Sequence, residues 1–316
     1  MPRSSARELV VLGTASQVPT KRRNHNGYVL HWDDETLLFD PGEGTQRQMT
    51  HAGVSASDLT RIAITHLHGD HSLGLAGVVQ RISLDGSPRE VPISFPASGE
   101  QWVRNLCEST AFHHREQLLL QGLEADGKVE RLPGESGTTL TARRLDHTIE
   151  AFGYRVDEPD GRSFDTAKLA EAGISGPAVG RLQRDGVIAS DGRLIHLADV
   201  TVPRRGQSMA FVMDTRLCDA AGELADGVDL LVIESTFLDS DRHLAVEYGH
   251  LTALQAAEIA AAAGVRHLVL THFSQRYPDS EDGEFERVFE AEAREAYDGP
   301  LTIARDLDRV TLPARR

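Results

Sequence analysis

Short runs of aliphatic and aromatic residues recur along the chain, separated by polar or helix-forming segments. Runs of this length that are rich in valine, isoleucine and leucine are typical of buried strands. The seven that we interpret as strands are Glu8–Leu12, Tyr28–Trp32, Thr36–Phe39, Arg61–Thr65, Ser208–Met213, Asp229–Ile233 and Arg266–Thr271. Helical patterns lie between several of them, most clearly at Thr252–Ala263, where Gly264 marks the usual end of a helix. This order of elements predicts an α/β fold.

One long segment departs from this pattern. From Asp157 to Gly206 the chain is rich in glycine, proline and arginine and has little apolar periodicity. We interpret it as an insertion in a single domain that spans residues 1–316. Because long insertions in compact domains are usually functional or mobile, we favour a functional role for this one.

Composition narrows the class of protein. The 316 residues are 40% hydrophobic and 26% charged, as expected for a globular chain of one large or two ordinary domains. No apolar run approaches the roughly 18 residues of a membrane-spanning helix. The first twenty residues also lack an apolar stretch of signal-peptide length. We therefore expect a cytoplasmic protein with no membrane partner.

Charge and cysteine content limit the ligands. A formal net charge of −15 disfavours a protein that coats itself in nucleic acid, although a local basic patch could still bind a polyanion. The two cysteines, Cys107 and Cys218, have no Cys-x-x-Cys spacing. This excludes a disulfide framework and a thiolate-rich zinc or iron–sulfur site. The fourteen histidines are a different matter, because imidazole is a common metal ligand.

The densest group of histidines directly follows a predicted strand. His66, His68, Asp70 and His71 form a His-x-His-x-Asp-His string after Arg61–Thr65. Strand ends are where α/β enzymes place their sites. Imidazole nitrogens and carboxylate oxygens are zinc ligands, and four of them exceed what one tetrahedral ion can take from a single turn. The string therefore indicates two metal ions rather than structural histidines.

Three further candidate ligands, His147, Asp214 and His272, lie at or just after apolar runs. Alone, each would more often be a capping aspartate or a hydrogen-bonded histidine, but the upstream string makes all three candidate metal ligands. The predicted sets are His66, His68 and His147 for one ion and Asp70, His71 and His272 for the other, with Asp214 as the bridge. Two ions about 3.5–4 Å apart activate water and stabilise both oxygens of a phosphodiester displacement.

The string and the later ligands resemble the metallo-β-lactamase superfamily. Within it, the chain is similar to the ribonuclease Z family of tRNA 3′-processing endonucleases. The segments most specific to that family are FDPGEGTQRQM at Phe39–Met49, GHLTALQAAEIA from Gly249 and THFSQRY from Thr271. With LGTASQVPTKRRN, THLHGDH, DHTIEAFGYRV, MDTRLCD and ESTF, they cover most of the chain in order.

The resemblance implies an αββα sandwich, in which two mixed β-sheets pack face to face with helices outside. It implies two Zn²⁺ per subunit on the seven ligand positions, with Asp70 also serving as proton acceptor. His250 is similar to a histidine that protonates or stabilises the leaving 3′ oxygen, although a helix-capping role is the alternative. Glu234 could orient His250, or it could simply be a solvated acidic residue.

The insertion resembles the flexible arm with which relatives grip the tRNA elbow. Its segment SGPAVGRLQRDG makes Arg181 and Arg184 the candidate phosphate contacts. Relatives have more lysine in this arm, and Leu251 stands where the family motif often has serine. Three further arginine pairs would add local positive charge, namely Arg22–Arg23, Arg143–Arg144 and Arg204–Arg205.

The resemblance thus implies a zinc-dependent endoribonuclease that cuts precursor tRNA after the discriminator nucleotide. The products would be a tRNA with a 3′-hydroxyl and a trailer with a 5′-phosphate. It also implies a homodimer in which one subunit's arm serves the other's active site, and no other protein partner is evident. Two alternatives stay open. One is a small-molecule phosphodiesterase or arylsulfatase of the same superfamily, and the other is a non-catalytic tRNA-binding protein.

Overall fold

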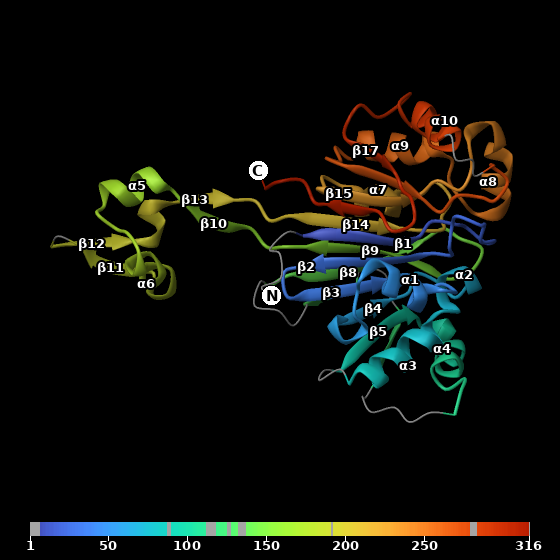
Figure 1. Cartoon of the computed structure of the whole chain (residues 1–316). Helices are drawn as coiled ribbons and strands as arrows, with labels where there is room; N and C mark the ends of the chain where they lie inside the picture. The colour runs from blue at the N-terminus through green and yellow to red at the C-terminus, as the bar shows by residue number, and fades with distance from the viewer. Residues whose placement is uncertain are drawn as a thin grey trace. The chain divides into compact units, whose positions relative to one another are not determined.

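The chain divides into two compact units, which we call the body and the inserted unit (Figure 1). The body comprises Met1–Val156 and Ser208–Pro313, and the inserted unit comprises Asp157–Gln207 with Ala314–Arg316. The computed structural model describes residues 7–86, 90–111, 118–124, 128–131, 137–190, 192–278 and 283–315.

Two mixed seven-stranded sheets form the body in the described part of the chain. The first has the order β18-β1-β2-β3-β4-β5-β6, with bounds β1 Glu8–Gly13, β2 Gly27–Trp32, β3 Glu35–Phe39, β4 Arg61–Ala63, β5 Val91–Pro96, β6 Leu118–Leu123 and β18 Arg309–Thr311. The second has the order β17-β16-β15-β14-β9-β8-β7, with bounds β7 Lys128–Arg131, β8 Thr139–Leu145, β9 Ala151–Asp157, β14 Ser208–Val212, β15 Leu230–Glu234, β16 Leu268–Thr271 and β17 Leu301–Ile303. Strands β3 to β6 are parallel, as are β14 to β17, so the carboxyl ends of several strands meet at one edge of each sheet.

Aromatic rings join the two sheets across the central core. The ring of Phe39 on β3 stacks on Phe211 of β14 with centroids 4.7 Å apart, and Tyr28 meets Phe211 edge-on at 5.0 Å. Side chains alternate between the faces of a strand. Leu9 and Val11 therefore face this core, whereas Val10 and Leu12 face the helices. Both faces of the strands are covered, which explains their continuous hydrophobic runs.

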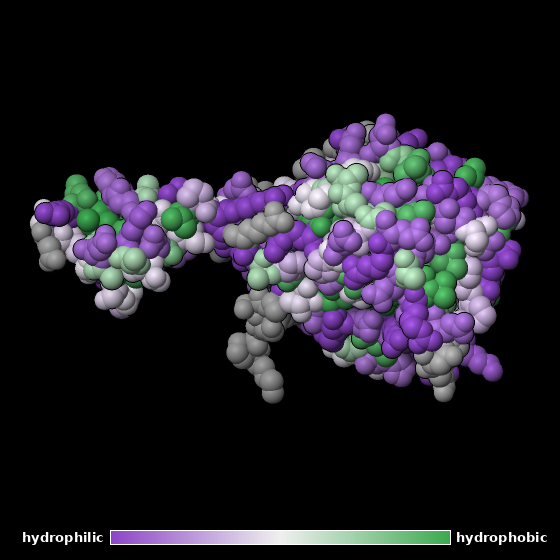
Figure 2. Space-filling model, turned by 90° about the horizontal axis from the view of Figure 1, so that it is seen from above, coloured by the Kyte–Doolittle hydropathy of each residue, from purple (hydrophilic) through white to green (hydrophobic). Residues whose placement is uncertain are grey.

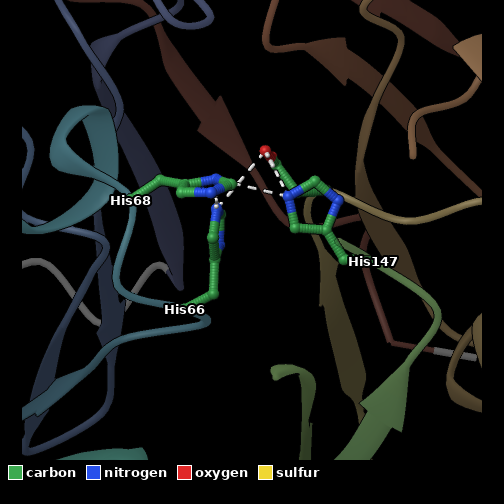
Figure 3. Close-up of side chains that lie close together, drawn as sticks. His66, His68 and His147 are labelled. Carbon is green, nitrogen blue, oxygen red and sulfur yellow. Dashed lines mark hydrogen bonds and ion pairs between the residues drawn. The ribbon is translucent and has the colours of Figure 1, made fainter. Parts of the chain in front are cut away.

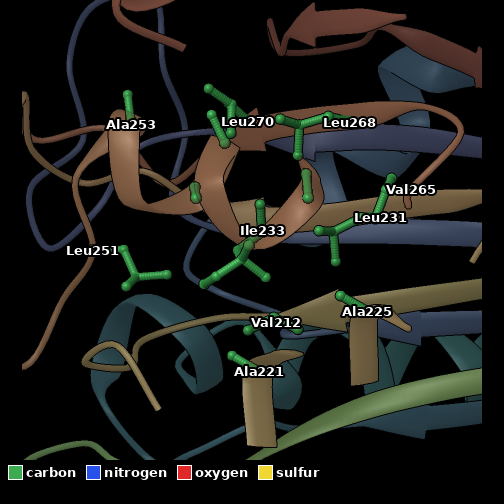
Figure 4. Close-up of a cluster of buried hydrophobic side chains, with 14 of the residues drawn as sticks. Val212, Ala221, Ala225, Leu231, Ile233, Leu251, Ala253, Val265, Leu268 and Leu270 are labelled. Carbon is green, nitrogen blue, oxygen red and sulfur yellow. The ribbon is translucent and has the colours of Figure 1, made fainter. Parts of the chain in front are cut away.

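Helices cover the outer face of each sheet. Those on the first sheet are α1 (Thr45–Ala52), α3 (Leu75–Asp85) and α4 (Glu100–Cys107), and those on the second are α7 (Asp219–Ala225), α9 (Ala253–Ala262) and α10 (Glu284–Ala293). Figure 4 shows how α7 and the alanine-rich α9 pack on β14 to β16 through Val212, Ile233 and Leu270. Leu251, the departure from the family motif, is fully buried in this cluster.

The short helices connect these elements. They are α2 (Gly69–Ser72), α8 (Arg242–Tyr248), η1 (Ala56–Asp58), η2 (Ala97–Gly99) and η4 (Asp239–Asp241). Thr252 and Gln255 form a reciprocal capping box at the start of α9. The four layers confirm the predicted αββα fold, and all seven predicted strands are present with ends that differ by at most two residues.

The inserted unit has secondary structure and a small core of its own. Its elements are β10 (Gly161–Phe164), α5 (Thr166–Glu171), α6 (Pro177–Asp185), β11 (Val187–Ser190), β12 (Arg193–His196), η3 (Leu197–Val200) and β13 (Thr201–Arg204). Leu169, Ile174, Leu182 and Val200 form its core. The sequence pattern did not predict these elements, because each is too short to show a clear period.

The surface is mainly polar. Figure 2 shows hydrophilic side chains over most of the visible face of each unit, with hydrophobic ones in small scattered groups. Among the described residues, no helix combines the length and the apolar character needed to cross a membrane.

Candidate metal centre

The structure brings all seven predicted ligands together at strand ends of the two sheets. His66 and His68 follow β4, and Asp70 and His71 lie in α2. The other three, His147, Asp214 and His272, follow β8, β14 and β16 respectively. They form two groups of candidate metal ligands, one with His66, His68, His147 and Asp214 and the other with Asp70, His71 and His272.

In the first group, three imidazoles converge (Figure 3). His68 Nδ1 lies 3.0 Å from His66 Nε2 and 3.3 Å from His147 Nε2. The Oδ2 atom of Asp214 lies 3.4 Å from His66 Nε2 and 3.7 Å from His147 Nε2. One oxygen and three nitrogens thus surround a common point.

The second group has the same form. His71 Nε2 lies 3.2 Å from His272 Nε2 and 3.3 Å from Asp70 Oδ2. The Oδ1 atom of Asp214 lies 3.3 Å from His71 Nε2 and 3.1 Å from His272 Nε2. Each carboxylate oxygen of Asp214 therefore faces a different group, which is the geometry of a bridging ligand.

These distances fit two tetrahedral cations. With zinc–ligand bonds of about 2.0–2.1 Å, the ligand atoms at the corners of a tetrahedron lie about 3.3 Å apart. Asp214 Oδ1 is buried and has no hydrogen-bond partner among the described residues. Such an orphaned oxygen is costly to bury unless a cation or a donor satisfies it. The residues present therefore fit a pair of metal ions.

The buried carboxylates around the two groups of candidate ligands also favour a bound cation. Burial alone would lower the pKa of His71, but the carboxylates of Asp214, Asp70 and Asp40 raise it well above its usual value. Burial would raise the pKa of Asp214, whereas the imidazoles of His272 and His71 lower it well below its usual range. The carboxylates thus favour positive charge at this position, and a metal ion supplies more of it than a protonated imidazole.

Asp40 orients two of the histidines through hydrogen bonds on the Nδ1 side of their rings, directly to His71 and through Thr65 to His66. Its Oδ2 atom accepts hydrogen bonds from His71 Nδ1 at 2.8 Å and from Thr65 Oγ1 at 2.8 Å. Because the Thr65 hydroxyl donates to Asp40, it accepts from His66 Nδ1, which lies 3.0 Å away. Both imidazoles therefore carry their proton on Nδ1 and leave Nε2 for a cation.

The other two imidazoles that present Nε2 are held in the same way. His147 Nδ1 donates to Gly249 O at 2.8 Å. His272 Nδ1 donates to Thr236 Oγ1 at 2.7 Å, and the Thr236 hydroxyl donates to Glu234 Oε2 at 2.5 Å. Glu234 is fully buried, so its interpretation as a solvated residue is wrong.

The side chain of His250 lies beside the two groups of candidate ligands. Its Nδ1 atom is 3.2 Å from Glu234 Oε1, which also accepts the backbone N–H of Thr215. The N-cap of α9 is Thr252, and at the end of α8 only the backbone N–H of His250 takes part, by donating to Ala245 O at 2.8 Å, so the His250 side chain does not cap a helix. Burial lowers the pKa of His250, but the Glu234 and Asp214 carboxylates raise it to about 9. The pairing of His250 with Glu234 matches the prediction in geometry.

Backbone conformation aims several of these side chains. Asp40, Asp214 and His272 have φ angles of 46°, 35° and 61°, in the left-handed region that residues other than glycine rarely adopt. Each follows directly on a strand or one residue later, where the sharp turn points the side chain into the centre. Such strained positions cluster at functional sites.

The centre forms the floor of a cavity of about 920 Å³. His68, Asp70, His147, Asp214 and His250 all line it, so the ligand groups are open to a substrate from one side. Ser16, Gln17, Leu73, Tyr248 and Arg276 are among the other lining residues. A cavity of this size can hold a nucleotide-sized ligand.

Comparison with known proteins decides the family. Ribonuclease Z of Streptomyces coelicolor is 57% identical over 313 residues, which cover 99% of this chain and 100% of the relative. The chain belongs to the ribonuclease Z family. Ribonuclease Z of Chlamydia trachomatis is 40% identical over 302 residues, covering 94% of this chain and 98% of that protein. Membership of the ribonuclease Z family makes the chain an enzyme.

Broader comparisons agree on the fold. Residues 7–131 match the family model for the anti-Pycsar protein Apyc1, and residues 191–273 match that for a beta-lactamase superfamily domain. The crystal structure of human tRNase Z, short form, superposes with a TM-score of 0.68 at 24% identity, covering 97% of this chain and 100% of that one. A diphosphatase from the PhnP family has a TM-score of 0.62 at 16% identity, covering 98% of this chain and 99% of that one. The fold that ribonuclease Z enzymes share with these proteins does not by itself select a substrate.

Sequence reasoning missed Asp40, Thr65 and Thr236. Asp40 lies in the FDPGEG segment directly after a predicted strand, the same signal that identified Asp214. Thr65 precedes the histidine string, and Thr236 lies two residues after Glu234. Threonines at strand ends are too common to stand out, so only the folded ribonuclease Z chain reveals these two contacts.

Proposed function

We propose that this chain is a zinc-dependent endoribonuclease that removes the 3′ trailer from precursor tRNA. It would hydrolyse the phosphodiester after the discriminator nucleotide, leaving a tRNA 3′-hydroxyl and a trailer 5′-phosphate. The observation that carries this proposal is the pair of ligand groups that share Asp214, with His250 beside them on the floor of one cavity. The close relationship to ribonuclease Z enzymes of other bacteria supports the choice of substrate.

The residues around the reacting phosphodiester have distinct tasks. When bound by the seven ligands, two zinc ions would activate water and neutralise phosphate oxygens. Asp70 lines the cavity and would accept the proton that the attacking water loses. His250 would protonate or stabilise the leaving 3′ oxygen through Nε2, because Glu234 holds its Nδ1. Glu234 would thus position His250 and, through Thr236, also His272.

The metal content tests the ligand assignment. We expect elemental analysis of zinc-loaded protein to give two zinc ions per chain, because the two groups share Asp214 and each offers four ligand atoms. Removal of zinc with a chelator should abolish cleavage, and added zinc should restore it. A content of one ion per chain in fully active protein would contradict the dinuclear assignment.

The inserted unit is the proposed tRNA-binding arm. Arg181 and Arg184 are three residues apart on α6, both are exposed, and neither forms an ion pair with a described residue. Several other arginines that could supply positive charge are occupied. Arg23 is buried, and each of the others pairs with an acid: Arg143 with Glu223, Arg144 with Glu150 and Arg204 with Glu158. Much of the positive charge expected from those arginine pairs is therefore already engaged within the protein. The proposed contacts with tRNA phosphates are accordingly the two arginines of α6.

Loss of the two α6 arginines should weaken tRNA binding and spare the chemistry. In the variant R181A/R184A we expect the KM for precursor tRNA to rise about tenfold to a hundredfold, since two phosphate contacts are lost. The slope of log affinity against log salt should fall by about two units. Turnover of a bis-aryl phosphate should not change. Gln183→Ala, also exposed on α6, is the matched control.

Deletion of residues 157–206 extends this test to the whole insertion. The body keeps both sheets and all seven ligands, so a bis-aryl phosphate should still be hydrolysed if the deletion variant folds. Cleavage of precursor tRNA should decrease mainly because the KM for this substrate rises. Equal losses on both substrates would mean that the segment supports the body, and unchanged tRNA cleavage would contradict its role as a tRNA-binding arm.

The cleavage assay itself decides between the substrates. Incubation of zinc-loaded protein with an end-labelled precursor tRNA should give one cut, after the discriminator nucleotide. Hydrolysis of a bis-aryl phosphate without any cut in tRNA would instead identify a small-molecule phosphodiesterase. We also propose a homodimer, on the family resemblance, which sedimentation equilibrium would show as twice the mass of one chain.

A further inference from the structure

An exposed aromatic ring stands at the rim of the metal centre. Tyr248 is the last residue of α8, lines the same cavity as the ligands and is 51% exposed. Its hydroxyl makes no hydrogen bond to any described residue. Most tyrosines of the described chain are instead at least half-buried and bonded through their hydroxyls, as Tyr28, Tyr154, Tyr277 and Tyr297 are. The ring of Tyr248 is therefore free to meet a ligand.

Hydrogen bonds connect the backbone around Tyr248 to the metal centre and to Arg216. The next residue, Gly249, has a φ of 79° and accepts the Nδ1–H of His147 on its carbonyl. A Cβ atom at Gly249 would lie 2.9 Å from His147 Nδ1, so glycine is required for this close approach. Arg216 adds a second tie, because its Nε donates to Val246 O at 3.0 Å.

The neighbours of Tyr248 along the chain and in the cavity include candidate residues of the metal centre. His250, two residues further on, lies 3.8 Å from Asp214 Oδ2 through its Nδ1 atom. Leu73, three residues after Asp70, is the other strongly exposed apolar side chain of the cavity, at 54%. An aromatic ring and an aliphatic side chain, both exposed in the cavity that the candidate ligands line, suit a flat, partly apolar group. In RNA that group is a nucleobase, and stacking on an aromatic ring is the usual way to hold an unpaired base.

We infer that Tyr248 is a substrate-binding residue that stacks on the base of a nucleotide adjoining the scissile phosphodiester. This inference rests on the proposed function. The base belongs either to the discriminator nucleotide or to the first nucleotide of the trailer. Stacking there fixes the backbone of the single strand over the metal centre and so determines which phosphodiester is cut.

The test compares Tyr248 variants on intact and abasic precursor tRNA. Tyr248→Ala should lower kcat/KM for intact precursor by about fivefold to a hundredfold, the usual effect of losing one base–aromatic stack. Tyr248→Phe and Tyr248→Trp should retain cleavage, because the ring and not the hydroxyl makes the contact. Val246→Ala is the matched control, since Val246 is 57% exposed on the same helix but does not line the cavity. Val246→Ala should cleave precursor tRNA and a bis-aryl phosphate as wild type does.

Abasic substrates identify the stacked nucleotide. One precursor lacks the discriminator base and another lacks the first trailer base. On the substrate that lacks the stacked base, wild type and Tyr248→Ala should be equal, whereas on the other they should still differ. The inference is overturned if Tyr248→Ala cleaves intact precursor as well as wild type does, or if both abasic substrates preserve the difference. Failure of wild type to cut precursor tRNA would instead count against the proposed function.

Discussion

Replacing Asp214 with asparagine is expected to reduce cleavage of precursor tRNA on the order of a thousandfold or more. The two oxygens of Asp214 face different groups of candidate ligands, so its charge would serve both of the proposed ions. Metal ions supply several kcal/mol of charge stabilisation in the transition state, and each 1.4 kcal/mol or so is tenfold in rate. Elemental analysis should show at most one ion per chain in this variant, beside the loss of activity.

Asparagine is the appropriate substitution because of the backbone at this position. Asp214 has a φ of 35°, which asparagine tolerates better than alanine, so loss of charge is separated from backbone strain. Asp229→Asn is a matched control. That carboxylate is also buried in the second sheet, where it accepts Ser208 N–H and pairs with Arg266, but it lies outside the ligand groups. The control should lose stability and keep two ions. Two retained ions with near-normal cleavage in Asp214→Asn would rule out the bridge.

The sequence predicted the layers of the body well because its strands are buried on both faces. Runs such as Leu9–Leu12 stay apolar for their whole length, and that pattern is hard to satisfy outside a covered sheet. The clustering of the candidate ligands was equally easy to predict, since His66, His68, Asp70 and His71 lie within six residues. The elements of the inserted unit were not predicted, because they are only four to nine residues long and pack on a core of only four buried side chains.

Contacts between distant segments account for what the sequence could not reveal. Arg23 was expected to add surface charge, but its guanidinium lies 4.1 Å from the centre of the Phe285 ring and 3.7 Å from a Glu286 oxygen. Its burial depends on a helix more than 250 residues away in the chain. Asp40 was likewise unassigned because its task depends on where the imidazoles of His66 and His71 lie. A motif names the ligands, whereas the groups that orient them become visible only in the fold.

Removal of the His250 imidazole should slow the chemical step and leave binding intact. His250→Ala is expected to reduce the single-turnover rate on precursor tRNA about a hundredfold to ten-thousandfold, the usual contribution of a general acid. The dissociation constant for tRNA, measured under conditions without cleavage, should not change. His243→Ala, exposed on α8 in the same segment, is the matched control and should behave as wild type.

The metal content of the His250→Ala variant distinguishes a role of His250 as general acid from a role as metal ligand. Asp214, His250 and His272 also come close enough to hold an ion, so His250 has an alternative role as a ligand. If it is the acid, His250→Ala should retain two zinc ions, and loss of one ion would assign it to the metal instead.

A change of leaving group completes this test of His250. A bis-aryl phosphate with an acidic phenol departs without protonation, because its oxyanion is already stable, whereas the 3′ oxygen of a ribose needs a proton or an equivalent charge. His250→Ala should therefore cleave the activated phosphate nearly as fast as wild type while failing on tRNA. Equal losses on both substrates would show that His250 acts on the attacking water or on the metal centre and not on the leaving oxygen.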